Sequence, residues 1–269
     1  MAISPLDLVL PPTKIPSQNN MKNKILPLTL ALLGCLALPA NTASAQLQTL
    51  EVDPSENWVG YMNVFDNAGG ATGSKGGYQF GSGWGLADLS SVFAPSTLTL
   101  APNFNTYANS LNGNNADRAY WTDSTDGGVT AGPLGNKWME ANTLVENNAL
   151  IGDTVTFQGN LDSFNLLSPN YTAVAFIKAL DPNAGYAAVI NQFSVLSSAG
   201  PFSVSADLRF ADGLIIQYGF TVTGLNANPA DAATFGSAVV QTVPEPSTYA
   251  LLALGAAGLG AHLVRRRRR

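Results

Sequence analysis

Apolar and polar positions alternate most clearly in the second half of the chain. In residues 202–210 every second residue is apolar, from Phe202 to Phe210. A period of two predicts a strand with one buried face. Residues 214–223 repeat the pattern after a short turn whose Asp-Gly pair suits a tight hairpin. We therefore predict that 202–210 and 214–223 pair as a β-hairpin.

Short apolar segments of the same kind recur along the chain. Residues 154–161, 171–180 and 186–195 predict three more strands, separated by turn sequences rich in Pro, Asn and Gly. Weaker strand patterns cover residues 57–66, 76–81, 96–102, 118–121 and 143–147. Residues 87–93 fit either one helical turn or a strand. No long stretch has the 3.6-residue period of a helix, so we expect an all-β protein. Roughly ten to twelve short strands of this kind are typical of an antiparallel β-sandwich, with a jelly roll as one arrangement.

The N-terminal region does not fit this strand pattern. Met21 is followed by two lysines, an apolar run over 25–38, and the small residues Ala43-Ser44-Ala45. This order predicts a signal peptide over 21–45. The apolar run has 14 residues, too few to cross a hydrocarbon core of about 30 Å. We expect signal peptidase to cut after Ala45, so that the mature chain begins at Gln46.

Residues 1–20 are unusual for the region that precedes a signal peptide, because they contain four prolines and no cluster of basic residues. Two interpretations are open. Translation starts at Met21, or the signal has an extended leader.

The C-terminal region has three successive parts. The sequence Val-Pro-Glu-Pro-Ser over 243–247 is followed by an apolar run over 249–264 and by five arginines, Arg265, Arg266, Arg267, Arg268 and Arg269. A helix of 16 residues is about 24 Å long, which makes a short and weak transmembrane anchor. The arginines stop transfer and stay on the cytoplasmic side. We expect residues 46–242 to lie outside the inner membrane.

Together these three parts resemble the PEP-CTERM sorting signal of proteins exported by Gram-negative, biofilm-forming bacteria. The resemblance implies recognition of Pro244, Glu245 and Pro246 by an exosortase, a membrane-embedded cysteine protease. It also implies a protein that is anchored transiently and then released to the cell surface or outside the cell. The two prolines suit this role, because they keep the segment extended and stop a helix from reaching it. The alternative is a plain C-terminal membrane anchor with a proline hinge.

Charge and reactive side chains limit what the 197-residue segment 46–242 can do. It has 16 acidic and five basic residues, a net charge of −11, so we expect no nucleic-acid partner. Cys35 lies in the signal peptide and His262 in the tail. The segment therefore lacks Ser-His-Asp triads, cysteine nucleophiles and nearly all zinc and copper sites. A glycosidase with two carboxylates remains open, but no spacing selects a pair, and we expect a protein that is not an enzyme.

Two groups of residues are candidates for binding. Asp123 and Asp126 precede two glycines and could hold Ca²⁺ on a tight loop, with a simple turn as the alternative; no other cofactor is expected. Trp84 and Trp121 lie near turns, where their rings could stack on sugar rings. The alternative is that both pack in the core, as most tryptophans do.

These observations favour a structural or adhesive protein of the cell surface or extracellular matrix. A carbohydrate-binding module for extracellular polysaccharide is the alternative, and a glycoside hydrolase a third. The expected partners are signal peptidase, the exosortase, the membrane before processing, and extracellular polysaccharide in the second case.

Overall fold

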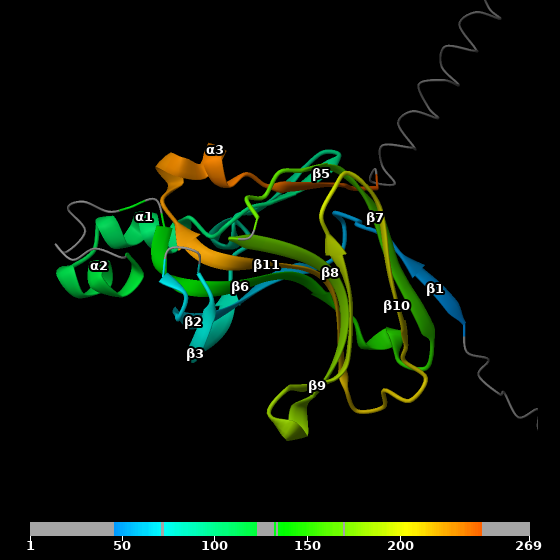
Figure 1. Ribbon diagram of the computed structural model, residues 1–269. Coiled ribbons are helices and arrows are strands. Elements are labelled where there is room, and N and C mark those ends of the chain that lie inside the picture. The colour runs from blue at the N-terminus through cyan, green and yellow to red at the C-terminus, as the bar shows by residue number, and fades with distance from the viewer. Residues whose placement is uncertain (1–45, 71–72, 123–131, 133, 169, 244–269) are drawn as a thin grey trace, which may run out of the picture. The chain divides into compact units, whose positions relative to one another are not determined.

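The computed structural model describes residues 46–70, 73–122, 132, 134–168 and 170–243 (Figure 1). These residues form twelve strands in two sheets, with a few short helices. Sheet B is antiparallel throughout, with spatial order β3 (Lys75–Trp84), β2 (Trp58–Asn67), β6 (Leu134–Glu146), β11 (Ile215–Ala227), β8 (Tyr171–Asp181) and β9 (Ala187–Leu196). The chain is therefore mostly β, as the alternating pattern predicts.

Sheet A is built around one long strand, β7 (Thr154–Phe164). Strand β10 (Gly200–Asp207) pairs with one edge of β7. The other edge pairs with β1 (Leu47–Leu50) along its first part and with β12 (Ala238–Gln241) along its last part. Strands β5 (Thr97–Leu100) and β4 (Ser91–Ala94) follow beyond β12. One pair, β1 with β7, is parallel. The expectation of purely antiparallel sheets is wrong there, because β1 is a short terminal strand that reaches β7 without a hairpin.

The apolar faces of the two sheets pack against each other. Phe157 of β7 lies 5.2 Å from Tyr218 and 5.3 Å from Phe220 of β11, measured between ring centroids. Phe202 of β10 also meets the Phe220 ring, at 5.6 Å. These aromatic residues belong to a large core with contributions from both sheets. Two layers around one core are the arrangement expected of a β-sandwich.

The predicted hairpin over 202–210 and 214–223 is wrong. Strand β10 pairs with β7 in sheet A, whereas β11 lies between β6 and β8 in sheet B. The connection between them passes from one layer to the other, and Leu208 and Ala211 within it are fully buried. A period of two shows which face of each strand is buried, but it does not show whether consecutive strands are neighbours in one sheet or face each other across a core.

The strand predicted over 118–121 is also wrong, because these residues belong to helix α2 (Asn115–Trp121). Asn114 caps this helix: its side-chain oxygen accepts hydrogen bonds from the backbone N–H groups of Ala116 and Asp117. Such a cap stabilises a helix by about 1 kcal/mol, which four residues of apolar pattern do not reveal. Residues 87–93 take both predicted forms, a 3₁₀ turn over Ala87–Leu89 and then β4.

A second, smaller core lies under the β3–β2–β6 side of sheet B. Helices α1 (Asn105–Leu111) and α2 lie at this side of the sheet, at the other end from β7 and β10 (Figure 1). The cluster contains Met62, Val64, Leu89, Met139 and Ala141, and Phe80, Trp84 and Trp121 pack against it. The remaining short helices are Asn148–Leu150, Pro182–Ala184, Pro229–Asp231 and α3 (Ala232–Phe235). No helix of the described residues is long and apolar enough to span a bilayer, and the expected transmembrane segment 249–264 lies outside them.

Candidate functional site

The two tryptophans singled out in the sequence line the same hollow, although 36 residues separate them in the chain. Trp84 ends strand β3 and Trp121 ends helix α2. The hollow has a volume of about 240 Å³, and its other lining residues come from α1 and α2: Asn105, Thr106, Asn109, Ser110 and Asp117. The structure thus brings the predicted pair together with polar side chains that the sequence pattern did not single out.

Each tryptophan has one side on the small core and a part on the hollow. Both indoles are half-buried and pack against the cluster around Met62. The Trp84 Nε1–H donates to the Ser82 hydroxyl at 2.7 Å, and the Trp121 ring meets the edge of Phe80 with 6.2 Å between centroids. These contacts fix the planes of both rings before any ligand arrives.

Polar groups of α1 line the hollow beside the indoles. The Asn105 amide donates to Asp88 Oδ1 at 2.7 Å, and its own oxygen accepts from Asn109 Nδ2 at 2.8 Å. Thr106 and Ser110 are buried beneath them. Side-chain amides, hydroxyls and a carboxylate next to aromatic faces are the donors and acceptors that bind sugar hydroxyls. The i, i+4 spacing of Asn105 and Asn109 marks one helix face, but only once a helix is known to be there.

One buried amide fixes the helices to the sheets. Asn226 is fully buried and lies at a bulge of β11, between the paired residues Leu225 and Ala227. Its Nδ2 donates to Thr106 Oγ1 at 3.0 Å and to the carbonyl oxygen of Trp121 at 2.9 Å, and its Oδ1 accepts from the Lys137 backbone N–H at 3.0 Å. A bulge turns a side chain out of the regular alternation, and here it aims an amide at both helices.

Gly135 of β6 makes room for this amide. A Cβ at Gly135 would lie only 2.1 Å from Asn226 Oδ1. The position of Trp121, and with it the shape of the hollow, therefore depends on a contact between β6 and β11 that no local sequence pattern reveals.

Four of the five basic residues in the described fold lie over aromatic rings, and one of them is Arg209, whose guanidinium carbon is 5.8 Å from the centroid of the Phe210 ring. The Nζ atoms of Lys75, Lys137 and Lys178 are 4.0 to 4.1 Å from the ring centroids of Phe65, Tyr120 and Phe176. Lys75 also pairs with Glu140 at 2.6 Å, and Lys137 with Asp66 at 3.0 Å. Burial lowers the pKa of Lys178, whose Nζ donates to Asn142 Oδ1 at 3.4 Å.

Most of the other predicted site residues lie outside the described part of the chain. These are Ala43, Ala45, Asp123, Asp126, Pro244, Glu245, Pro246 and the five terminal arginines. Gln46 is the first described residue, and its backbone N–H donates to Asp153 Oδ1 at 3.0 Å. Among the described residues, no group of three or more His, Cys, Asp or Glu side chains could hold a metal ion.

The chain leaves the fold directly from the middle of sheet A. Strand β12 lies between β5 and β7, and the next two residues are still bonded to the domain. The Thr242 N–H donates to the Ser96 carbonyl at 2.9 Å, and the Val243 N–H donates to the Val52 carbonyl at 3.0 Å. The described fold therefore continues up to the residue before Pro244.

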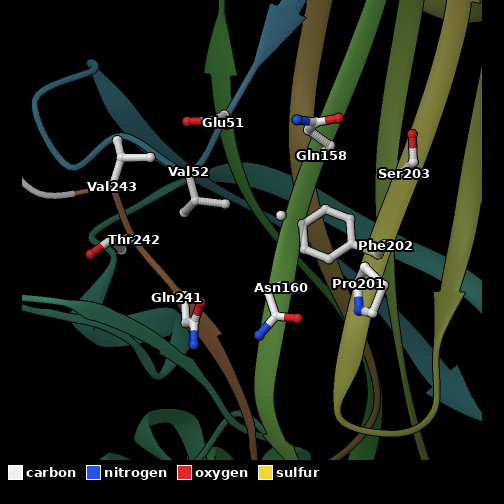
Figure 2. A pocket seen from close by; sticks show the side chains of 11 residues that line it. Glu51, Val52, Gln158, Asn160, Pro201, Phe202, Ser203, Gln241, Thr242 and Val243 are labelled. Carbon is white, nitrogen blue, oxygen red and sulfur yellow. The ribbon is translucent and has the colours of Figure 1, made fainter.

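A second hollow lies beside the last described residues, Gln241 to Val243 (Figure 2). Strand β1 pairs with β7 up to Phe157, and β12 pairs with β7 from Leu161 onward, so neither strand pairs with residues 158–160. The resulting hollow has a volume of about 670 Å³ and is lined by Glu51, Val52, Gln158, Gly159, Asn160, Pro201, Phe202, Ser203, Gln241, Thr242 and Val243. Phe202, at 7% exposure, offers too little ring surface for stacking.

Comparison with known families adds one finding at this end of the chain. Residues 242–269 match the model of the PEP-CTERM protein-sorting motif. The chain carries a PEP-CTERM motif. The match shows an exported protein that passes through the membrane and is processed by exosortase-type machinery, and it confirms the resemblance inferred from the sequence. No curated protein and no solved structure matches the chain significantly. The PEP-CTERM match begins at Thr242, so its first two residues are part of the described fold.

Proposed function

We propose that this chain is an exported, non-enzymatic protein that is held at the membrane, released by exosortase-type processing, and retained at the cell surface or in the extracellular matrix. Its domain over 46–243 has a structural or adhesive role there. The observation that carries this proposal is the PEP-CTERM motif joined directly to a two-layer β domain. The composition supports it, because the domain has no histidine or cysteine for nucleophilic or metal chemistry.

The sorting part of this proposal is tested in the native host. Glu245→Ala removes the acidic residue of the motif, so the variant should remain full-length and membrane-bound, whereas the unaltered protein is shortened and released. Asp212→Ala removes an exposed carboxylate of the domain and should be processed normally. Immunoblots of membrane and medium fractions measure both. Release of the Glu245→Ala protein at the normal rate would contradict the proposal.

A specific observation favours carbohydrate binding as a second candidate function. Trp84 and Trp121 meet at one hollow with the side chains of Asn105, Asn109 and Asp117. We propose that the exposed parts of the indoles pack on a sugar ring while the amides and the carboxylate bond to its hydroxyls. The contacts that already fix both rings support this role, because a ligand then loses little affinity to ordering them.

The size of the hollow limits the ligand. Its volume of about 240 Å³ is below the roughly 300–1,000 Å³ of pockets for drug-sized ligands. The proposed ligand is therefore one or two sugar units of an extracellular polysaccharide rather than a long buried chain. With a few hydrogen bonds and one stacked face, we expect a dissociation constant on the order of 0.1–1 mM.

A glycan array followed by calorimetry tests this second function with the processed protein. Trp84→Ala and Trp121→Ala should each weaken binding at least about tenfold, or roughly 1.4 kcal/mol. Phe210→Ala is the matched control, because Phe210 is 87% exposed and lies outside the hollow. If all three variants bind alike, the hollow is not the site. If no glycan binds, the carbohydrate function is excluded and the structural or adhesive role is the remaining proposal.

A further inference from the structure

Strand β9 forms one edge of sheet B (Figure 1). It pairs with β8 on one side, and no strand of the described residues pairs with its other side. A ten-residue edge presents a row of backbone N–H and C=O groups that can pair with another strand. The edge is regular over Ile190–Leu196, where seven consecutive residues pair with β8 and the only register shift lies before them.

From Ile190 onward, β9 has none of the usual protection of an edge, because its one register shift lies before that segment. Its ten residues, AAVINQFSVL, include no charged residue and no proline. Val189, Phe193 and Val195 are about 60% exposed, with fractions of 62%, 59% and 60%. Natural proteins protect exposed edges with lysine, proline or bulges, because an unprotected apolar edge associates with other chains.

The opposite edge of the same sheet shows the contrast. Strand β3 begins with Lys75, which pairs with Glu140. Its register against β2 shifts twice, between Val64 and Phe65 and between Phe65 and Asn67. A charge and two register shifts make β3 a poor template for pairing with another strand. Strand β9, in contrast, offers seven regularly paired residues without a charge.

Charge indicates what can approach this edge. The segment 46–242 has a net charge of −11, so two copies repel each other over most of their surfaces. A strand without charge is the place where two copies meet at the least electrostatic cost. Identical edges also match without any further partner, because a two-fold axis places the same patch on both sides of the interface.

We propose that two copies of this protein associate through antiparallel pairing of their β9 strands, which joins two B sheets into one continuous sheet. The proposal names a partner for the structural role and rests on that role. A two-fold pairing of identical edges is closed, so it gives a dimer rather than an open fibre.

The regular part of the strand fixes the register. The pairing that uses all seven residues from Ile190 to Leu196 has its centre at Phe193. Phe193 then lies opposite Phe193 of the second copy, and Asn191 lies opposite Val195. Directly opposed aromatic residues are favourable cross-strand pairs, worth roughly 0.2–1 kcal/mol each. The contact is about 23 Å long, which is small for an interface, so a weak and reversible dimer is expected, suited to the high local concentration of a matrix.

Sedimentation equilibrium of the processed protein tests the association from about 1 to 500 µM. We expect a reversible monomer–dimer equilibrium with a dissociation constant on the order of 10–100 µM. Phe193→Lys places two like charges opposite each other and should raise that constant at least about tenfold. Phe210→Lys, at another exposed ring, should leave it within about twofold. A wild-type monomer at every concentration, or equal behaviour of both variants, overturns the proposal.

Disulfide trapping tests the register. Apart from Cys35 in the signal peptide, the chain has no cysteine, so the processed protein offers a thiol-free background. In Phe193→Cys, directly opposed residues have Cα atoms about 4.5–5.5 Å apart, which suits a disulfide. This variant should cross-link under mild oxidation at least about tenfold faster than Asn191→Cys, whose partner position is Val195. Equal rates would overturn the register, and rates no higher than that of Phe210→Cys would overturn the pairing.

The two proposals fail separately. A protein that is sorted and released but stays monomeric refutes only the β9 contact. A protein that dimerises through Phe193 but ignores the loss of Glu245 refutes only the sorting role.

Discussion

Asn226 offers the sharpest test of how the candidate sugar site is held in place. Its amide connects the bulge of β11 to Thr106 of α1, to the carbonyl of Trp121 in α2, and to the backbone of Lys137 in β6. Asn226→Ala removes all three bonds and adds no bulk. We expect both a loss of stability and a loosening of the helices that line the hollow.

The size of the loss follows from which partners remain unsatisfied. The Thr106 hydroxyl keeps its bond to Asn103 Oδ1 at 2.7 Å, so it loses little. The Lys137 N–H and the Trp121 carbonyl both lose their bond to the Asn226 amide. Each buried group left without a partner costs about 1–3 kcal/mol. The expected loss is therefore about 2–6 kcal/mol, a large part of the roughly 5–15 kcal/mol that stabilises a typical domain.

Urea unfolding followed by circular dichroism measures this loss. Asn228→Ala is the matched control, because the Asn228 side chain accepts one local bond, from the Ala230 N–H at 3.0 Å, and its loss costs about 1 kcal/mol. Any glycan that binds the unaltered protein should bind Asn226→Ala more weakly, even where that variant is still folded. If the two variants differ by less than about 1 kcal/mol, the amide does not hold the helices and the reasoning is refuted.

Three further predictions concern other parts of the molecule. Burial lowers the pKa of Lys178 from its ordinary 10.5, so between the two values the unfolded chain binds more protons at this residue and the contribution of Lys178 to stability rises with pH. Burial raises the pKa of Tyr171 and Tyr218, which act in the opposite direction near pH 10, so the test is a difference: urea unfolding should show the wild type gaining stability relative to Lys178→Met between pH 7 and 10. A Cβ at Gly219 would lie 2.2 Å from the Thr143 carbonyl oxygen, whereas Gly213 has open space, so thermal unfolding should show Gly219→Ala losing at least about 3 kcal/mol more than Gly213→Ala. Mass spectrometry of the released protein should find a C-terminus at Val243 or beyond; a cut within β12 would contradict this.

The sequence predicted individual strands far better than their partners. Residues 154–161 and 171–180 lie within β7 and β8, because alternation reflects a pleated strand with a buried face, and 186–195 match β9 to within one residue although that strand is mostly exposed. The supposed hairpin over 202–223 failed, since Leu208 and Ala211 carry the chain through the core into the other sheet. A pattern with a period of two contains no information about that choice.

The candidate site was predictable only in part, for a related reason. Trp84 and Trp121 were recognisable as aromatic residues near turns. Their proximity depends on helix α2, which the sequence pattern did not predict. Helix α1, NTYANSL, has seven residues and little apolar periodicity, so its asparagines did not stand out. The bonds of Asn226 span 89 to 120 residues of sequence, and no local pattern records contacts of that range.

The order of strands along the chain connects the fold to its export. Strand β12 joins β5 to β7, so sheet A cannot be continuous until residues 238–241 are in place. The motif that directs sorting follows only two residues later, and Val243 is still bonded to Val52. A cut beyond Val243 therefore releases a domain with all its described strands, whereas a cut before Ala238 separates β5 and β4 from the rest of the sheet. Because the last described strand ends before the motif begins, we expect a cut beyond Val243 to release the domain without separating any of these strands.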